Sequence, residues 1–300
     1  MPELPEVETI KRGLKTRVVG KAIRSIKVLE PKSAFFNKED EKFAISEISK
    51  IKRRGKVLIL NLANGYSLMF HLKMTGQIVF DGAKQEKEIR RNREYEIRFA
   101  GGHPTSSMAG ELPDKSTRVI FELDDGSKLF FNDQRKFGWV KIVPTKEIVK
   151  DSLIKKMGPE PEKLTDKQVK SLVKNKIKNS SRMIKSIILD QNIIAGVGNI
   201  YADEALFFAR IHPETRGRDL TEYKIDSLLD AVTSVLKTAT GHGGTSFTNY
   251  VKVDGAKGRY LEKAWVFRRE GNPCKRCGAT IKKIRVGARG THYCPNCQIK

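Results

Sequence analysis

The hydrophobic pattern of the chain changes along its length, and its first part predicts a helix. Residues 5–18 carry apolar side chains at helical spacing, at Val7, Ile10, Leu14 and Val18. Acidic residues cluster at the start of this segment, where the dipole of a helix favours negative charge. We expect the helix to end near Gly20.

Short apolar runs follow, separated by turn-forming residues such as Ala63-Asn64-Gly65. The runs predict strands at 23–29, 57–62, 66–72, 78–80, 95–99, 119–123, 128–132 and 139–143. Many short strands with this punctuation are typical of a β-sandwich. Residues 81–93 and 101–115 are polar and predict loops on either side of one strand.

The pattern becomes helical after Pro144, and prolines at 159 and 161 indicate a linker. Residues 145–240 predict helices, with N-caps at Thr165-Asp166 and Leu220-Thr221, and glycines at 241–244 interrupt them. We therefore expect an α+β multidomain chain. Its parts would be an N-terminal β-sandwich with flanking helices at 1–143, a linker at 144–162, a helical domain at 163–265 and a small unit at 266–300.

The charge of the chain favours a polyanionic partner. Its 300 residues include 58 Lys and Arg against 35 Asp and Glu, a formal net charge of +23. Residues 169–188 alone carry six basic side chains and no acid. Nucleic acid is the first candidate partner and an anionic membrane surface the second, whereas a mere aid to solubility would not favour one sign.

The same composition argues against several classes of protein. No stretch approaches the ~18 uncharged apolar residues of a membrane-spanning helix. The acidic start of the chain lacks the apolar core of a secretory signal, so we expect a cytoplasmic protein. Apolar runs recur throughout, which argues against simple disorder.

All four cysteines lie near the end of the chain, as Cys274-x-x-Cys277, sixteen residues, and Cys294-x-x-Cys297. Two such pairs suit one tetrahedral Zn²⁺, with a pair of disulfides or redox-active thiols as the alternative. The segment is too small to be held by burial alone, so the metal would supply its folding energy. The loop between the pairs carries basic residues, Arg289 among them, that could lie beside a phosphate backbone.

The N-terminus offers a candidate nucleophile. If Met1 is removed, Pro2 carries a free secondary amine, and α-amines have a pKa near ~8. Such an amine can attack an aldehyde-like carbon and give an iminium ion, and Glu3 or Glu6 could move protons beside it. A frayed tail or a simple helix start is the alternative.

Several motifs resemble, in the same order, those of the formamidopyrimidine-DNA glycosylase and endonuclease VIII family. They are the start Met1-Pro2-Glu3-Leu4-Pro5-Glu6, then Arg53-Arg54-Gly55-Lys56, His71-Leu72-Lys73-Met74-Thr75-Gly76, Asp133-Gln134-Arg135-Lys136-Phe137-Gly138, Gly196-Val197-Gly198-Asn199-Ile200-Tyr201-Ala202-Asp203-Glu204 and the cysteine unit. The resemblance spans essentially the whole chain. It implies a β-sandwich, a helix-two-turn-helix domain, a β-hairpin zinc finger, and DNA in the cleft between the domains.

The resemblance also implies a bifunctional DNA repair enzyme that excises an oxidised base and then cleaves the abasic strand. Pro2 would attack C1′ of the damaged nucleotide, and Glu3 would act as general acid and base. Elimination at the 3′ and then the 5′ phosphate would follow, with no cofactor beyond one structural Zn²⁺. Glu6 would help to hold this N-terminal site.

The resemblance assigns DNA contacts to further residues, each with a structural alternative. Lys56 would reach the phosphates that flank the lesion, or be a solvated lysine at a strand start. His71 would contact phosphate, or be a satisfied histidine at a strand end. The space left by the flipped base would be filled by three side chains, with core packing as the alternative for the two apolar ones: Met74, Arg135 and Phe137.

The helical and zinc-binding parts would contribute the remaining contacts. Asn199 would bind the DNA backbone and Arg289 the phosphates of the lesion. Glu204 would face the active site, or be a surface helix residue. The segment 247–260, which ends at Tyr260, resembles the loop that caps an oxidised purine, and it favours that branch over the pyrimidine-preferring endonuclease VIII branch.

Two features depart from the family pattern: the segment 84–112 is longer than usual, and Ser116 stands where many relatives have histidine.

We expect a monomeric, nucleoid-associated bacterial protein that binds damaged double-stranded DNA and no membrane. A non-catalytic zinc-ribbon protein that only binds nucleic acid is the alternative from a different class.

Overall fold

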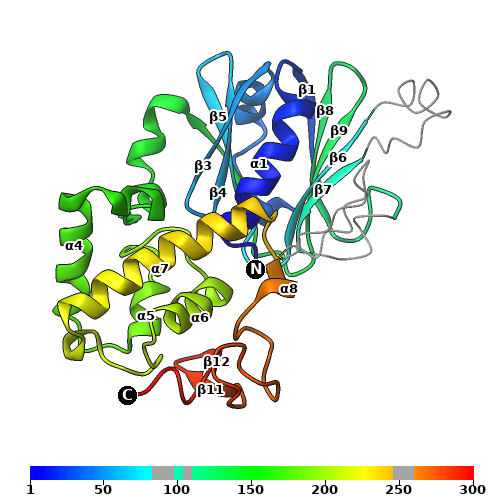
Figure 1. The fold of residues 1–300 in the computed structure, drawn as a ribbon. Helices are drawn as coiled ribbons and strands as arrows, with labels where there is room; N and C mark the ends of the chain where they lie inside the picture. The colour runs from blue at the N-terminus through cyan, green and yellow to red at the C-terminus, as the bar shows by residue number, and fades with distance from the viewer. Residues whose placement is uncertain (83–97, 104–109, 246–259) are drawn as a thin grey trace. The chain divides into compact units, whose positions relative to one another are not determined.

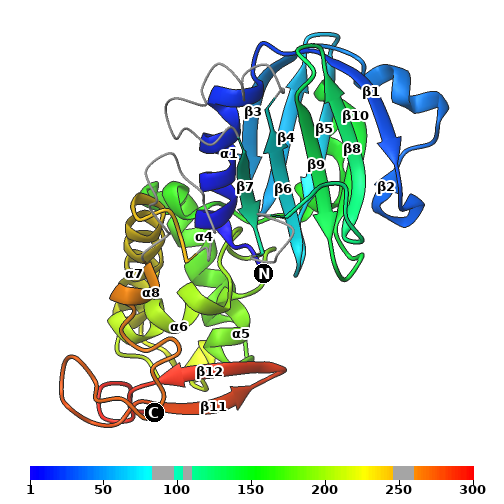
Figure 2. The same ribbon diagram turned by 90° about the vertical axis from the view of Figure 1, so that its right-hand side faces the viewer.

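The computed structural model describes residues 1–82, 98–103, 110–245 and 260–300 (Figures 1 and 2). The chain forms two compact units, Met1–Ile154 with Gly243–Gly258, and Lys155–His242 with Arg259–Lys300. The first unit therefore extends into the predicted linker of 144–162. Residues 95–97 of one predicted strand and most of the long segment 84–112 lie outside the described residues.

The first unit is a β-sandwich, as the strand pattern predicted. One five-stranded sheet has the order β1 (Ile23–Val28), β8 (Thr117–Leu123), β9 (Lys128–Asp133), β6 (Gly76–Asp81) and β7 (Phe99–Gly102). The other has the order β2 (Ala34–Phe35), β10 (Trp139–Pro144), β5 (Tyr66–His71), β4 (Val57–Leu62) and β3 (Ile48–Arg54). Neighbouring strands are antiparallel except β2 and β10.

The strand prediction missed β2 and β3 and misplaced part of β7. Among the described residues β3 pairs only with β4, so it is an edge strand, and its two lysines are exposed. β2 has two residues, too few for any pattern. Gly101 and Gly102 pair with Ile78 and Gln77, although they were expected in a polar loop.

Helix α1 (Leu4–Val18) closes one side of the sandwich. It packs against β7 and β3, the edge strands of the two sheets, and Figure 2 shows it running alongside them. Its predicted apolar face is fully buried in the core that the sheets share. The approach to β7 is close, because a Cβ on Gly13 would collide with the Phe99 ring. The sandwich core therefore fixes the helix whose first turn carries the N-terminal residues.

The remaining elements of the first unit are short helices that border the sheets. They are the 3₁₀ helices η1 (Pro31–Ser33), η2 (Glu39–Ala44) and η4 (Thr145–Lys150), and α3 (Ser152–Lys156), which runs from the first unit into the second.

The second unit is helical and ends in a β-hairpin. Its helices are η5 (Pro161–Thr165), α4 (Lys167–Lys178), α5 (Ile184–Ile188), α6 (Asn199–Phe208), η6 (Gly217–Asp219), α7 (Glu222–Gly241) and α8 (Tyr260–Lys263), and its hairpin is β11 (Lys282–Val286) with β12 (Arg289–Tyr293). The predicted N-caps are confirmed, since Asp166 accepts from Val169 N–H and Thr221 from Lys224 N–H. None of the described helices is long and apolar enough to cross a membrane.

The basic run at 169–188 is largely paired within this unit. Lys174 contacts Asp226 of α7 at 2.8 Å, and Lys170 contacts Asp230 of the same helix at 2.7 Å. The other four cations of the run bond to carbonyl or carboxylate oxygens: Lys176, Lys178, Arg182 and Lys185. Four of these six cations therefore lie in ion pairs with acids of the same unit.

Candidate functional site

The N-terminal residues are buried and held by hydrogen bonds. Pro2 is buried and Glu3 is 3% exposed. The Glu3 N–H donates to Glu6 Oε2 at 2.8 Å, while Glu6 Oε1 accepts from both the N–H and the hydroxyl of Thr245, at 2.7 and 3.0 Å. One buried carboxylate thus joins the start of α1 to a segment more than two hundred residues away.

The backbone beside Thr245 is built around this carboxylate. Gly244 has a φ of +75°, and a Cβ there would lie 2.6 Å from Glu6 Oε1. Only glycine combines that backbone conformation with so close an approach. The geometry gives Glu6 the contacts that a role in holding the N-terminal site requires.

Sequence reasoning missed His103, which follows β7. Burial is the main cause of the lowered pKa of His103, and the positive N-terminal amine lowers it further, while Asp133 opposes the shift. The ring therefore lies within electrostatic range of the chain terminus. No local pattern pointed to it, because β7 brings it there through pairing with β6.

Lys56 and His71 lie at the ends of two paired strands and influence each other. Lys56 is 5% exposed, which excludes the solvated-lysine interpretation. The pKa of His71 is lowered to about 3, first by burial and then by the positive charges of Lys73 and Lys56. Its Nδ1 accepts from the Lys73 N–H at 3.0 Å, so the neutral ring carries its proton on Nε2. That nitrogen can donate to an anionic oxygen.

The three side chains assigned to the DNA stack lie on two turns of the first unit. Met74 is half-buried and Arg135 is exposed. Phe137 is 55% exposed, with the Arg135 guanidinium 4.9 Å from its ring centroid, so core packing is the wrong interpretation for Phe137. Lys73 and Lys136, one in each turn, have positive φ values of 48° and 58°, a strain that functional sites often hold.

Asp133 joins these two turns, and sequence reasoning gave it no role. The carboxylate is fully buried and accepts from the Thr75 hydroxyl, from the Arg135 N–H at 3.2 Å and from the Gly138 N–H at 2.6 Å. It therefore fixes the turn after β5 relative to the turn after β9. The sequence signal was weak, since an aspartate before a turn is ordinary.

In the second unit, Asn199 and the zinc-finger hairpin come together. Asn199 is the first residue of α6, and Gly196 before it has a φ of +96°. Its side-chain amide donates to the Gly290 carbonyl at 3.0 Å. Arg289 is the preceding residue and its side chain is exposed. The structure thus places two predicted phosphate-binding residues within one hydrogen-bonded group.

Glu204 and Tyr260 are both buried in the second unit. Glu204 is 0% exposed and its oxygens accept from the N–H groups of residues 265–267 and from the Tyr260 hydroxyl. It is therefore not a surface residue, and its oxygens hold the chain that leads to the zinc finger. Burial raises the pKa of Glu204, and the N–H donors oppose that shift. Tyr260, 3% exposed, packs on Tyr201 rather than lying open to DNA.

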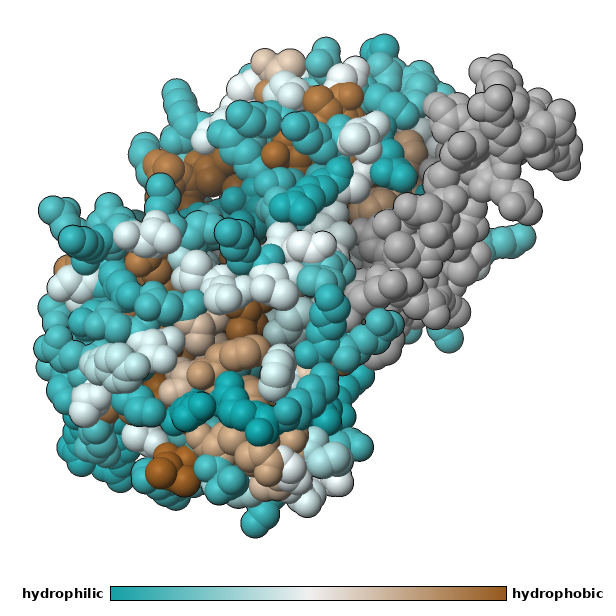
Figure 3. Space-filling model, viewed as in Figure 1, coloured by the Kyte–Doolittle hydropathy of each residue, from teal (hydrophilic) through white to brown (hydrophobic). Residues whose placement is uncertain are grey.

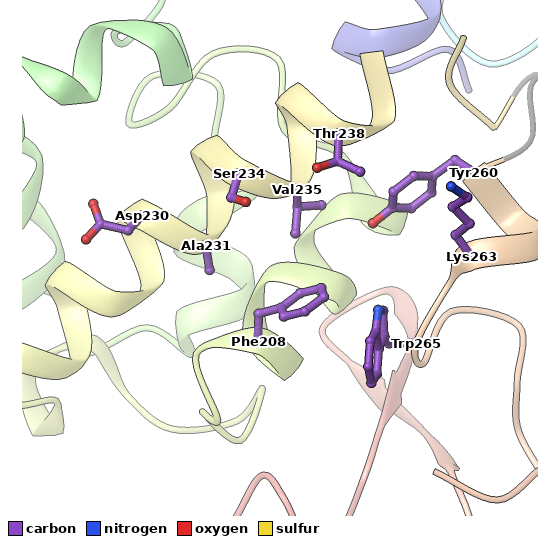
Figure 4. A pocket seen from close by; sticks show the side chains of 9 residues that line it. All are labelled: Phe208, Asp230, Ala231, Ser234, Val235, Thr238, Tyr260, Lys263 and Trp265. Atoms are coloured by element: carbon purple, nitrogen blue, oxygen red, sulfur yellow. The ribbon is translucent and has the colours of Figure 1, made fainter. Parts of the chain in front are cut away.

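Tyr260 also lines a cavity of about 400 Å³ in the second unit (Figure 4). The figure shows Phe208 and Trp265 on one side and α7 on the other. Most of the lining is apolar, so the cavity suits a ring or an aliphatic group better than a phosphate. The rest of the predicted loop 247–260 lies outside the described residues.

The four cysteines form one cluster whose geometry fits Zn²⁺. Their sulfur atoms lie within 4.8 Å of one another, and none is disulfide-bonded. Tetrahedral Zn–S bonds of about 2.3 Å place sulfurs roughly 3.8 Å apart, and Cys277 and Cys294 are 3.5 Å apart. A hydrogen bond from the Ala279 N–H lowers the pKa of Cys277 to about 6, whereas burial raises the pKa of Cys294 and of Cys297. A bound Zn²⁺ would supply the positive charge that keeps these sulfurs as thiolates. The disulfide alternative is thereby rejected.

Removing the metal should unfold the finger and change the environment of Trp265. This indole stacks on Phe207 at 5.6 Å and packs against the cluster that contains Cys274 and Cys294. In a Trp139→Phe background, we expect one Zn²⁺ per chain by atomic emission and a red-shifted Trp265 fluorescence after chelation. Cys294→Ser should show the shifted spectrum without chelator. An unchanged spectrum in the metal-free protein would contradict the structural role of zinc.

His71 should make the fold sensitive to acid. Because its folded pKa is about 3 and an unfolded histidine titrates near 6.5, only the unfolded chain binds this proton between those values. Stability at this site is therefore complete above pH 6.5 and falls as pH is lowered, by at most ~1.4 kcal/mol per pH unit. Urea unfolding at pH 7.5, 6 and 5 should show a smaller decline for His71→Gln than for wild type. Equal declines in the free energy of unfolding of the two proteins would contradict the lowered pKa of His71.

Comparison with known protein families covers nearly the whole chain. Residues 1–140 match the formamidopyrimidine-DNA glycosylase N-terminal domain, 157–250 the H2TH domain of the same glycosylase, and 271–299 the zinc finger found in FPG and IleRS. The formamidopyrimidine-DNA glycosylase of Pelotomaculum thermopropionicum is 39% identical over 301 residues, 99% of each chain.

Solved structures agree with this assignment. A mutant of the Lactococcus lactis enzyme in complex with Fapy-dG-containing DNA has a TM-score of 0.83 and 33% identity, with full coverage of both chains. The wild-type Lactococcus lactis enzyme in complex with DNA that contains an oxidised pyrimidine has a TM-score of 0.81 and 33% identity, again over both full chains. The sandwich, the helical unit and the four-cysteine finger, with the motifs they carry, place this chain in the formamidopyrimidine-DNA glycosylase family.

Proposed function

We propose that this chain is a bifunctional DNA glycosylase and AP lyase that excises oxidised purines, 8-oxoguanine and formamidopyrimidines, from duplex DNA in base excision repair. Family membership supports the class of activity, a DNA repair glycosylase. The observation that carries the finer proposal is the start of the chain, where Pro2 and Glu3 are buried and the Glu3 N–H donates to the Glu6 carboxylate. Burial of the second and third residues is unusual, because the ends of a chain are ordinarily frayed.

The proposed reaction begins when removal of Met1 frees the secondary amine of Pro2. The amine attacks C1′ of the damaged nucleotide, the N-glycosidic bond breaks, and the base leaves with the bonding electrons and takes up a proton. Glu3 protonates the deoxyribose ring oxygen, so the sugar opens to an iminium joined to Pro2. Loss of a C2′ proton then expels the 3′ phosphate, and loss of a C4′ proton expels the 5′ phosphate. Water finally hydrolyses the iminium, which releases the unsaturated aldehyde and restores the Pro2 amine.

The remaining site residues would hold the duplex. Lys56 and the neutral His71 can donate to phosphate oxygens from the first unit, and Asn199 and Arg289 can do so from the second. The exposed Arg135–Phe137 pair and Met74 can occupy the space of an extruded nucleotide, which offsets part of its unstacking cost of a few kcal/mol. The zinc, once bound, holds the hairpin that carries Arg289.

Lesion preference rests on the resemblance of 247–260 to the purine-capping loop. Relatives with a TM-score above 0.8 have been solved with a Fapy-dG lesion and with an oxidised pyrimidine. Endonuclease VIII-type excision of oxidised pyrimidines is therefore the second candidate function. Damaged duplex DNA as the partner, action as a monomer and a place at the bacterial nucleoid belong to the same proposal.

Borohydride trapping tests the N-terminal mechanism. Intact mass should first show a chain that begins at Pro2. With an 8-oxoguanine duplex, wild type should give a covalent adduct that maps to Pro2, and Pro2→Gly should cut strand cleavage by about 100-fold or more, the scale of one reacting group. Lys15→Ala, on the exposed face of the same helix, is the matched control and should match wild type. A free N-terminal proline with no adduct would refute the lyase mechanism.

Parallel excision assays separate the two candidate lesion classes. Single-turnover rates on 8-oxoguanine and thymine glycol duplexes of identical flanking sequence should favour the purine by about tenfold or more, the effect of one good hydrogen-bonding contact. Faster release of thymine glycol would reverse the proposed specificity while leaving the shared chemistry intact.

A further inference from the structure

A buried ion pair in the second unit has no part in the mechanism above. Lys185 of α5 and Asp203 of α6 lie 2.6 Å apart, and both side chains are 0% exposed. Burying two charges costs more than their attraction returns unless further hydrogen bonds satisfy them. The partners that satisfy this pair therefore indicate what it is for.

Those partners belong to strand β12 of the zinc-finger hairpin. The Lys185 ammonium donates to the Thr291 hydroxyl at 2.7 Å and to the Gly290 carbonyl at 3.2 Å. Asp203 Oδ2 accepts from the His292 N–H at 2.9 Å, with His292 Nδ1 at 3.3 Å. Three consecutive residues of one strand are thus fixed to two helices, and they directly follow Arg289.

The Gly290 carbonyl is shared with a predicted phosphate-binding residue. It accepts from Asn199 as well as from Lys185. Since Asp203 and Asn199 lie one turn apart on α6, the ion pair, the Asn199 amide and the strand after Arg289 form one group. Movement of the strand would displace Arg289 relative to Asn199.

Zinc alone leaves the tip of the hairpin without a second anchor. Cys294 follows the end of β12, whereas Arg289 begins the strand. At roughly 3.3 Å per residue, the arginine lies on the order of 15 Å along the strand from the metal ligand. The Lys185–Asp203 pair contacts β12 next to Arg289, at the end of the strand that is distant from the metal ligand Cys294.

We infer that Asp203 is a positioning residue for DNA binding, which acts through Lys185 and β12 to hold Arg289 beside Asn199. The inference rests on the proposed function, since it concerns the fit of two residues to a phosphate backbone. It differs from a purely structural role, because it requires that the benefit of Asp203 to binding depend on Arg289.

A double-mutant cycle measures that dependence. The four proteins are wild type, Asp203→Asn, Arg289→Ala and the double variant, and the quantity is Kd for a duplex that holds an uncleavable abasic-site analogue at fixed salt. We expect Asp203→Asn to weaken binding by about tenfold when Arg289 is present and by less than about threefold when it is absent. The same factor in both backgrounds would overturn the inference.

A second variant covers the case in which Asp203→Asn folds poorly. Thr291→Val keeps the buried shape but removes the hydroxyl that accepts from Lys185, and we expect about threefold weaker binding that again disappears with Arg289→Ala. Zinc content and thermal unfolding of each variant report the state of the fold. Additivity in this second cycle as well would reject the positioning role.

The matched control is a partly exposed ion pair of the same unit. Asp226→Asn breaks the contact to Lys174 between α7 and α4, far in sequence from the hairpin, and should bind DNA as wild type does. Coupling between Asp226 and Arg289 would mean that the cycle reports general destabilisation and would overturn the inference. Failure of wild type itself to bind the duplex would instead refute the proposed function.

Discussion

A carboxylate buried in a protein must be matched by hydrogen-bond donors, because an unpaired charge in the interior is costly. Several carboxylates of this chain meet that demand with donors from distant segments. Four examples among the described residues, each at most 4% exposed, are Glu6, Asp133, Asp203 and Glu204. Each fixes a segment that carries or borders a candidate site residue: the N-terminus, the Met74 and Phe137 turns, the strand after Arg289 and the chain leading to the zinc finger.

The apolar core and these carboxylates hold the site residues in different ways. Sandwich packing buries α1 against both edge strands, and the contact between Gly13 and Phe99 leaves little freedom for the helix to slide. Apolar contacts have no direction, however, and tolerate small rotations. Hydrogen bonds are directional, so those of Glu6 and Asp133 fix the orientation of the segments they bind. The proposed nucleophile Pro2 and the proposed stacking residues on the two turns both need a fixed orientation.

Part of the net positive charge of the chain is paired with acids inside the fold. Lysines of α4 are matched by acids of α7, and Lys185 is wholly internal. The surface in Figure 3 is predominantly hydrophilic all the same. Among the described residues, the exposed cations Arg135 and Arg289 stand on ordered backbone, a turn and the start of β12 respectively. The positions of the exposed cations therefore matter more for binding a duplex than the net charge of the chain.

The sequence by itself determined the β-sandwich, α1, the helix caps and the zinc cluster, because each is written in local spacing: apolar periodicity, a cap residue or paired cysteines. The sequence also identified the family, because the family's motifs are short runs of residues that can be read directly from the chain. Only the tertiary structure decided that β3 is an edge strand, that Asp133 holds two turns, that Glu204 and Tyr260 are buried, and which acids pair with the basic run. These depend on contacts between residues far apart in the chain, and local patterns carry no record of such partners.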